Sequence, residues 1–225
     1  MIIEITDLLL APPAMTMRYT SNRLIVGRGD VILIVSDPPT DGRYLLRVLA
    51  TLAPPERGEY RFNGTRVDIN DYRQCLAVKR RIGYVAPDAA MISNRTIREN
   101  LLLSRLYSEN DPTIDIDKTM LSLCRAAGLT HKLARRPSVL SNQALQKAIT
   151  IREIGKQPTV MLIDRPENFI ENMETDMIFG HLKEMARSGT AMVFISRNRH
   201  MADLANRQLT LAGGKIQVSA VNRSQ

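Results

Sequence analysis

Three short runs of consecutive apolar residues constrain the fold of this chain more than any other feature. They are Val31–Val35, Val160–Ile163 and Ala191–Ile195. Runs without polar alternation are typical of strands buried on both faces of a parallel sheet. A helix-like amphipathic stretch follows each run in turn, over Arg43–Leu52, Asn172–Arg187 and Arg199–Ala205. This alternation of strand and helix predicts an α/β fold.

The ends and the middle of the chain have different patterns. Antiparallel strands are expected at the ends, over Ile2–Leu10, Tyr60–Phe62, Arg207–Leu211 and Lys215–Val218. The turn formers Asn63-Gly64 and Gly213-Gly214 support that reading. Helices are expected in the middle, after the capping-box spacing Thr96–Glu99, over Asp115–Ala127, and from Ser141 to about Ile154. We therefore expect a single domain over residues 1–225 with a helical lobe over approximately 88–156.

Composition excludes few functions but favours some over others. The formal net charge is +8, and aromatic residues make up only 4% of the chain, with no Trp. Sparse aromatics argue against base stacking, so no nucleic acid is expected as a partner. The basic excess fits a solvated surface or a partner near a membrane. Cys75 and Cys124 are far apart and form no metal or redox motif.

Five segments, in this order, resemble a known family. They are RRIGYVAPDAAMISNRTIRENLLL, VLSNQALQKAITIREI, TVMLIDRPE, AMVFISRNRH and LANRQLTLAGGKI. Their layout is similar to that of the nucleotide-binding subunits of ATP-binding cassette (ABC) transporters, over about Ile3 to Ile216. The resemblance implies a RecA-like, mostly parallel sheet with helices on both faces, an antiparallel β region and a helical lobe.

The segment between the first buried strand and the helix after it, where a phosphate-binding loop would lie, lacks the residues that bind phosphate. Such a loop needs glycines, a Lys for the phosphates and a Ser or Thr for magnesium. The alignment implied by the resemblance puts Ser36, Pro39 and Asp41 at the glycine positions. Gly42 falls at the lysine and Arg43 at the magnesium ligand, with Tyr44 next in the helix. Two readings stay open: an ordinary strand-to-helix turn, or a rewired anion site that uses Arg43 and the helix N-terminus.

Two further motif positions of the family have also changed. Pro87 stands where the family has a Gln that senses the γ-phosphate, and proline has no side-chain donor or acceptor. Of the family's LSGGQ signature, Ser141 remains, whereas Asn142 and Gln143 replace glycines that approach phosphate closely. Ser141 is expected either to cap a helix or to contact phosphate.

The catalytic positions that the resemblance implies are altered too. Asp164 remains at the position that organises magnesium, but Arg165 replaces the glutamate that activates water, and Arg197 replaces the switch histidine. A guanidinium cannot accept a proton at neutral pH. Glu167 is not counted as a substitute. We therefore expect no catalytic residue and no metal ligand.

Six charged residues fall together around the implied nucleotide site. They are Arg43, Arg165, Arg197, Asp37, Asp41 and Asp164. One hypothesis is that they form an internal charge network in place of nucleotide, because buried charges need partners. The alternative is that several of them point to solvent. Tyr19 is the nearest candidate for an aromatic contact with adenine.

The resemblance implies a head-to-tail dimer with another ABC ATPase subunit, as homodimer or heterodimer. It also implies docking on transmembrane permease subunits at the cytoplasmic face of the membrane. A groove lined by roughly Asp88–Arg95 and Tyr107 would receive a short helix of the permease. The leading hypothesis is a non-catalytic structural or regulatory subunit; the alternatives are an ATPase with altered motifs and a soluble adaptor. No cofactor is expected, and any binding of Mg-ATP is expected to be weak.

Overall fold

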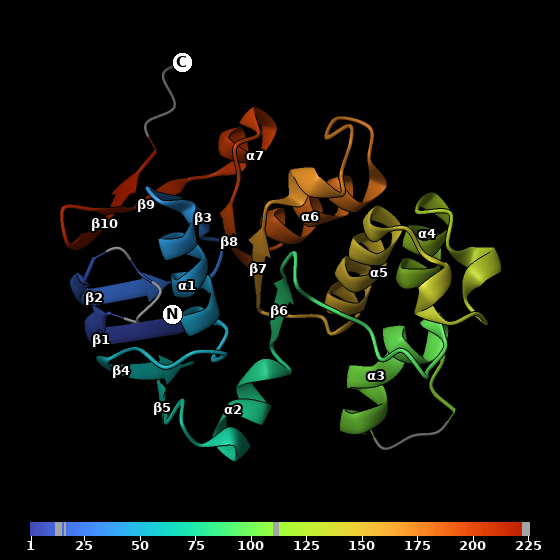
Figure 1. The fold of residues 1–225 in the computed structure, drawn as a ribbon, viewed down its shortest axis with the longest axis horizontal. Helices are drawn as coiled ribbons and strands as arrows, with labels where there is room; N and C mark the ends of the chain where they lie inside the picture. The colour runs from blue at the N-terminus through green and yellow to red at the C-terminus, as the bar shows by residue number, and fades with distance from the viewer. Residues whose placement is uncertain (12–14, 16, 110–112, 222–225) are drawn as a thin grey trace.

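The structure, a computed structural model, describes residues 1–11, 15, 17–109 and 113–221. A ten-stranded sheet runs through it in the order β5-β4-β1-β2-β10-β9-β3-β8-β7-β6 (Figure 1). The strands are β1 (Ile3–Leu10), β2 (Tyr19–Val26), β3 (Val31–Ser36), β4 (Arg57–Phe62), β5 (Thr65–Val67), β6 (Ile82–Val85), β7 (Val160–Asp164), β8 (Ala191–Ile195), β9 (Arg207–Ala212) and β10 (Lys215–Ala220). The helices are α1 (Pro39–Leu49), α2 (Tyr72–Lys79), α3 (Ile97–Glu109), α4 (Lys118–Ala126), α5 (Asn142–Gly155), α6 (Met177–Arg187) and α7 (Arg199–Leu204). Short 3-10 turns lie at Thr130–Lys132 (η1), Pro137–Val139 (η2) and Pro166–Asn168 (η3). The predicted α/β fold is confirmed.

The parallel half of the sheet is buried on both faces. Strands β9, β3, β8, β7 and β6 are parallel neighbours, and every residue of β7 and β8 is buried. Along β7, Val160 and Leu162 join the core that contains α1, whereas Met161 and Ile163 join the core that contains α5 and α6. The side chains on both faces of β7 therefore pack against other parts of the protein. This packing explains the continuous apolar runs in the sequence.

The other half of the sheet is mainly antiparallel, as predicted for the chain ends. Strand β1 pairs with β2 and β4, β4 with β5, and β9 with β10. Asn63 and Gly64 join β4 to β5 with φ values of 48° and 81°, which suit a tight hairpin turn. Strands β2 and β5 and helix α2 were not predicted. Only three of the eight β2 residues are buried, so its sequence, YTSNRLIV, has no long apolar run.

Helices α1 and α6 begin at residues other than those expected. Helix α1 begins at Pro39 rather than Arg43, because proline at the first helical position already has a helical φ. Helix α6 begins at Met177 rather than Asn172, since the Asp176 carboxylate caps it by accepting N–H bonds from Ile178 and Phe179 at 2.8 and 3.3 Å. The earlier start of α1 shortens the turn that would have to cradle phosphate.

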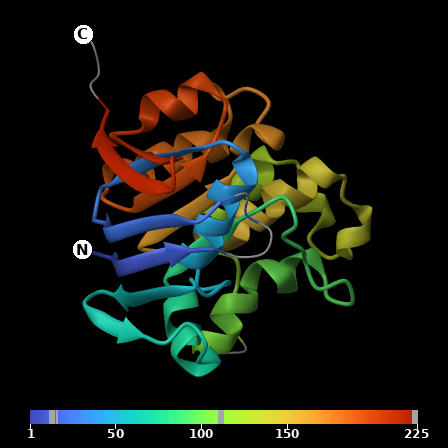
Figure 2. The ribbon, with the colours of Figure 1, turned by 60° about the vertical axis from the view of Figure 1, so that its left-hand side comes forward.

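The chain between β6 and β7 forms helices on one side of the sheet (Figures 1 and 2). We call residues 97–155, with α3, α4, η1, η2 and α5, the helical segment. The cap predicted at Ser141 is confirmed, because its hydroxyl accepts the Ala144 N–H at 3.3 Å. The helix expected from Asp115 begins instead at Lys118, because the Asp117 carboxylate caps it by accepting the Met120 N–H at 2.8 Å. Among the described residues, no helix has the length and apolar character that a bilayer crossing requires.

Candidate functional site

The carboxyl ends of β3, β7 and β8 meet at one edge of the parallel sheet, beside the N-terminus of α1. These strands end at Ser36, Asp164 and Ile195, and Asp164 lies opposite Ile195 in the β7–β8 register. This edge is where open α/β sheets bind ligands. The sheet therefore brings together the altered phosphate loop, the altered acidic motif and the altered switch segment.

The turn from β3 into α1 uses its own backbone donors. The Gly42 N–H donates to Ser36 Oγ at 3.0 Å, and the Asp41 N–H donates to the Pro38 carbonyl at 3.2 Å. Pro38 and Pro39 have no N–H to offer. A phosphate loop works by aiming such free N–H groups at the ligand. Here the donors of Asp41 and Gly42 bond within the turn instead.

The position aligned with the phosphate-binding lysine is closely packed. A Cβ atom on Gly42 would lie 2.7 Å from Ser36 Oγ, 3.0 Å from Ile34 Cγ2 and 3.3 Å from Ile195 Cδ1. Contacts under 3 Å to these atoms are not tolerated without movement. A side chain at position 42 would therefore require the Ser36 hydroxyl to rotate away and the Ile34 and Ile195 side chains to shift.

Arg43 forms the dominant charge contact of the site. Its Nε atom donates to Asp164 Oδ2 at 2.6 Å, and the Asp164 side chain is only 1% exposed. The second carboxylate oxygen of Asp164 lies 3.8 Å from Arg165 Nε. Burial raises the pKa of Asp164, and the positive charge and hydrogen bond of Arg43 oppose that rise. A guanidinium thus sits at the carboxylate that the family resemblance assigns to magnesium.

Asp41 and Tyr19 do not have the places expected of them. The Asp41 carboxylate is fully buried and accepts a hydrogen bond from the Tyr19 hydroxyl at 2.9 Å, so it points into the core. Tyr19 is 1% exposed and offers no ring face to an adenine. The expectation of an adenine contact at Tyr19 is wrong. Negative charge at the loop surface is left to the exposed Asp37.

Three of the six charged residues are in ion-pair contact. They are Arg43, Asp164 and Arg165. Arg197 has an exposed side chain, and its backbone N–H donates to Glu167 Oε1 at 3.0 Å. Glu167, which the sequence reasoning set aside, also accepts the Ser196 hydroxyl at 2.7 Å. Glu167 therefore links the turn after β7 to the loop after β8. The sequence does not reveal this role, because the bonded residues are about 30 positions apart.

The altered signature lies next to the acidic motif. One cavity of ≈290 Å³ is bordered by residues of both motifs, including Pro87, Asn142, Gln143, Asp164 and Arg165. Asn142 is the first residue of α5, the helix that Ser141 caps.

Polar contacts hold the walls of this cavity. Gln143 Nε2 donates to Glu171 Oε1 at 2.7 Å, and Gln146 Nε2 donates to the Pro87 carbonyl at 3.2 Å. Tyr44 lies apart from this cavity and donates its hydroxyl to the Pro54 carbonyl at 2.7 Å.

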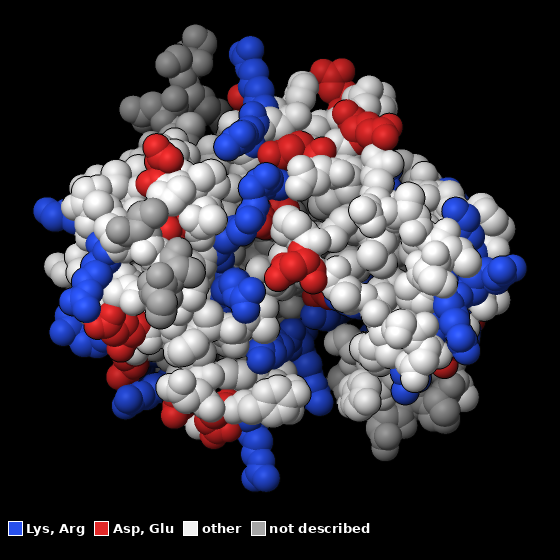
Figure 3. All heavy atoms as spheres, in the orientation of Figure 1, with Lys and Arg blue, Asp and Glu red and all other residues white. Residues whose placement is uncertain are grey.

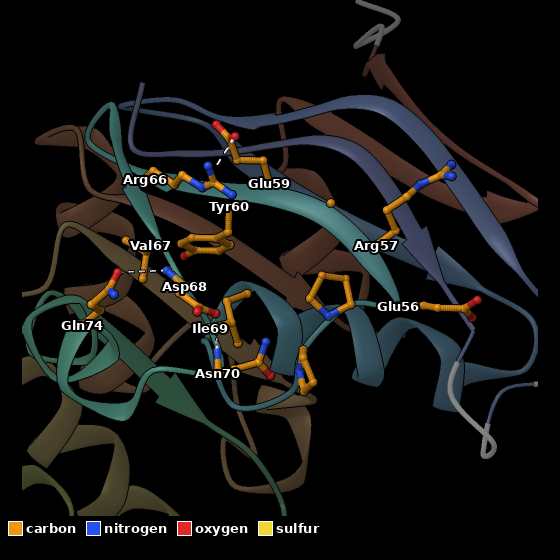
Figure 4. A pocket seen from close by; sticks show the side chains of 13 residues that line it. Glu56, Arg57, Glu59, Tyr60, Arg66, Val67, Asp68, Ile69, Asn70 and Gln74 are labelled. Carbon is orange, nitrogen blue, oxygen red and sulfur yellow. Dashed lines mark hydrogen bonds and ion pairs between the residues drawn. The ribbon is translucent and has the colours of Figure 1, made fainter.

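A second, polar cavity of ≈500 Å³ lies beside β4, β5 and the start of α2 (Figure 4). Some of its lining residues bond to each other: Arg66 pairs with Glu59 at 3.6 Å, and Gln74 Oε1 accepts the backbone Asp68 N–H at 3.0 Å. None of the site residues expected from the sequence borders it. In the described part of the chain, no group of three or more His, Cys, Asp or Glu side chains is placed to hold a metal ion.

Comparisons with known proteins identify the family of this chain. The ABC transporter family model matches residues 43–168. The lipoprotein-releasing system ATP-binding protein LolD of Psychrobacter arcticus is 26% identical over 201 residues, which are 88% of this chain and 89% of that protein.

Solved structures show the same fold. The ATP-binding cassette MJ0796, solved as a dimer bound to ADP and Pi, superposes with a TM-score of 0.79 at 17% identity, covering 98% of this chain and 99% of that one. CbiO1 of Clostridium perfringens, part of the transporter complex cbiONQ, gives a TM-score of 0.70 at 14% identity over 97% and 88% of the two chains. Because the family model matches more than half of its length, this chain belongs to the ABC transporter family.

Proposed function

We propose that this chain is a non-catalytic cassette subunit, which serves as the structural or regulatory partner of an active ATPase in a membrane transport complex. The observation that carries the proposal is the contact between Arg43 and Asp164 at 2.6 Å. It pairs Asp164, the acidic residue that the family resemblance assigns to magnesium, with an internal cation. Magnesium would have to displace that cation before it could reach the carboxylate.

The chemistry around this contact supports the same conclusion. Gly42 has no side chain to reach the phosphates, and Arg165 cannot act as a base. Glu167, the next carboxylate along the chain, already accepts bonds from Ser196 and Arg197. The family match also begins at Arg43, so the turn before it lies outside the matched residues. We expect weak binding of Mg-ATP at best, and no turnover.

A partner could still use part of this chain. In a head-to-tail dimer each nucleotide lies between the phosphate loop of one subunit and the signature of the other. A partner with intact motifs would place its own nucleotide opposite Ser141–Gln143 of this chain. That arrangement keeps one working ATP site in a heterodimer, whereas a homodimer would have none. The proposal therefore favours an active ABC ATPase as the partner.

A groove between α2, α3 and α5 supports docking on a permease. It encloses ≈580 Å³ and is bordered by Tyr72, Leu76 and Tyr107, of which the two tyrosines are 66% and 75% exposed. Figure 3 shows a hollow between the β6 side of the molecule and α3. Tyr107 and roughly Asp88–Arg95 were expected to line this groove, and Tyr107 does border it. Of the expected range, 88–90 border the adjoining cavity, and 91–95 border neither. Exposed aromatic residues in a hollow are suited to bind an apolar helix. They support the proposal that the subunit docks on a permease at the cytoplasmic face of the membrane.

The test of the proposal is phosphate release from saturating Mg-ATP by the purified chain, with the variant Asp164→Asn purified in the same way. We expect equal, background-level release from both proteins, because neither performs hydrolysis. Turnover that is present in the natural chain and lost in Asp164→Asn would refute the proposal. The paired design separates intrinsic activity from a contaminating ATPase, which would be unchanged by the substitution.

A further inference from the structure

The net positive charge of this chain is concentrated in one stretch of the sequence. Residues 118–152 contain seven Lys and Arg residues and no Asp or Glu, while the whole chain has a formal net charge of +8. This stretch forms α4, η1, η2 and α5 of the helical segment. Most of the net charge therefore sits on one part of the fold.

Four of these cations form what we call the cationic rim. They are Arg125, Lys132, Arg135 and Arg136. The three arginines are exposed and Lys132 is half-buried. No ion pair joins any of the four to another residue that the structure describes, whereas Lys147 and Arg152 of the same stretch pair with Asp176 and Glu153. In Figure 3, basic side chains gather at the outer edge of the molecule over α4 and the turns after it.

The backbone under the rim is held in place. The Ile97 N–H donates to the Arg135 carbonyl at 2.8 Å, and the Arg98 N–H donates to the Leu133 carbonyl at 2.9 Å. These bonds fix the turn that carries the rim to the start of α3. Val139, which is 40% exposed, follows the rim in sequence and adds an apolar side chain to the same surface segment.

We propose that the cationic rim binds the anionic headgroups of a phospholipid bilayer directly. Its cations come from the end of α4, from η1 and from the turn after it, and three of the four are exposed. An anionic lipid surface is negative over its whole area, so it can attract exposed cations that do not form a pocket. This attraction requires only that the cations lie near the surface. The lipid contact goes beyond the proposed function, since it involves neither the permease groove nor the nucleotide site.

The test uses protein-free vesicles and three forms of the full-length chain. The rim variant combines Arg125→Gln, Lys132→Gln, Arg135→Gln and Arg136→Gln. The control combines Arg57→Gln, Arg66→Gln, Arg73→Gln and Lys215→Gln, which removes the same charge from exposed residues of β4, β5, α2 and β10. Sedimentation with phosphatidylcholine vesicles, with and without a third of phosphatidylglycerol, measures binding at physiological salt. Circular dichroism checks that each variant is folded.

We expect the natural chain and the control to sediment with anionic vesicles and not with pure phosphatidylcholine. Each neutralised rim cation should weaken binding about 5-fold, so the rim variant should lose at least about 100-fold in affinity. Equal losses in rim and control variants would overturn the proposal, because net charge alone would then explain binding. So would an absence of vesicle binding, or binding of the rim to soluble polyglutamate in place of vesicles. None of these outcomes bears on ATP hydrolysis, so the proposed function is tested separately.

Discussion

The contact between Arg43 and Asp164 makes a quantitative prediction about stability. Replacing Arg43 by Met leaves the Asp164 carboxylate 1% exposed, with only Arg165 Nε at 3.8 Å beside it. Removing one partner of a buried pair costs about 3–5 kcal/mol, and we expect about 3 kcal/mol because Arg165 remains. Asp164→Asn should cost about 1–2 kcal/mol, since the Arg43 side chain is 36% exposed and can turn to water.

A double-mutant cycle isolates this contact. Urea unfolding of Arg43→Met, Asp164→Asn and the double variant should give a coupling free energy of about 2 kcal/mol. The exposed pair Arg95 and Glu99, 3.6 Å apart, provides the matched control, with an expected coupling of about 0.3–0.5 kcal/mol. Equal coupling in the two cycles, or a cost of Arg43→Met below about 1 kcal/mol, would refute our account of the site.

The destabilisation caused by Arg43→Met should depend on pH. Burial already raises the pKa of Asp164 above its ordinary value of 3.8, and loss of Arg43 removes the main opposing effect. A carboxyl group whose pKa is raised in the folded state does not lower the free energy of unfolding at pH values where it is protonated in both the folded and the unfolded state. It costs stability as the pH rises from the unfolded-state pKa through the folded-state pKa. The destabilisation of Arg43→Met should therefore shrink as the pH is lowered from 7 towards the unfolded-state value, and a variant that also carries Asp164→Asn should lack this trend.

Substitutions at three further positions test the surroundings of the site. Gly42→Lys should destabilise the fold by about 2 kcal/mol, because its Cβ would lie 2.7 Å from Ser36 Oγ, and it should not create ATP binding; urea unfolding and calorimetry check both. Glu167→Gln should speed amide exchange at Arg197, whose N–H it holds at 3.0 Å, and unchanged exchange would contradict that role. Ser141→Ala should cost about 1 kcal/mol in thermal or urea unfolding, whereas Ser141→Asp should keep the helix cap.

Much of the fold could be predicted because its strongest signals are local. The apolar runs at Val160–Ile163 and Ala191–Ile195 indicate doubly covered strands, and β7 and β8 lie there. The cap at Ser141 can be read from a single residue, whereas the start of α4 at Lys118 was placed three residues too early, at Asp115. Strand β2 was missed because it is only partly buried and its sequence is polar, so its apolar pattern is weak.

The site was less predictable because its contacts join distant residues. Arg43 and Asp164 were recognised as neighbours only through the family resemblance, and their 2.6 Å contact depends on how α1 sits against β7. The Asp41 carboxylate lies within α1 and points towards Tyr19, because the helix begins at Pro39. Proline favours such a start, but the prediction placed it at Arg43. Glu167 gave no signal, because its partners come from a different strand–loop junction.

The central claim of this account is that the nucleotide site of this cassette is occupied by its own side chains and is not available to ATP. Calorimetric titration of the purified chain with Mg-ATP at physiological salt tests the claim most directly. We predict no detectable heat of binding at millimolar nucleotide, since the donors of the turn and the Asp164 carboxylate are already engaged. Binding in the micromolar range would contradict the account, because it would mean that Arg43 and its neighbours form a working anion site.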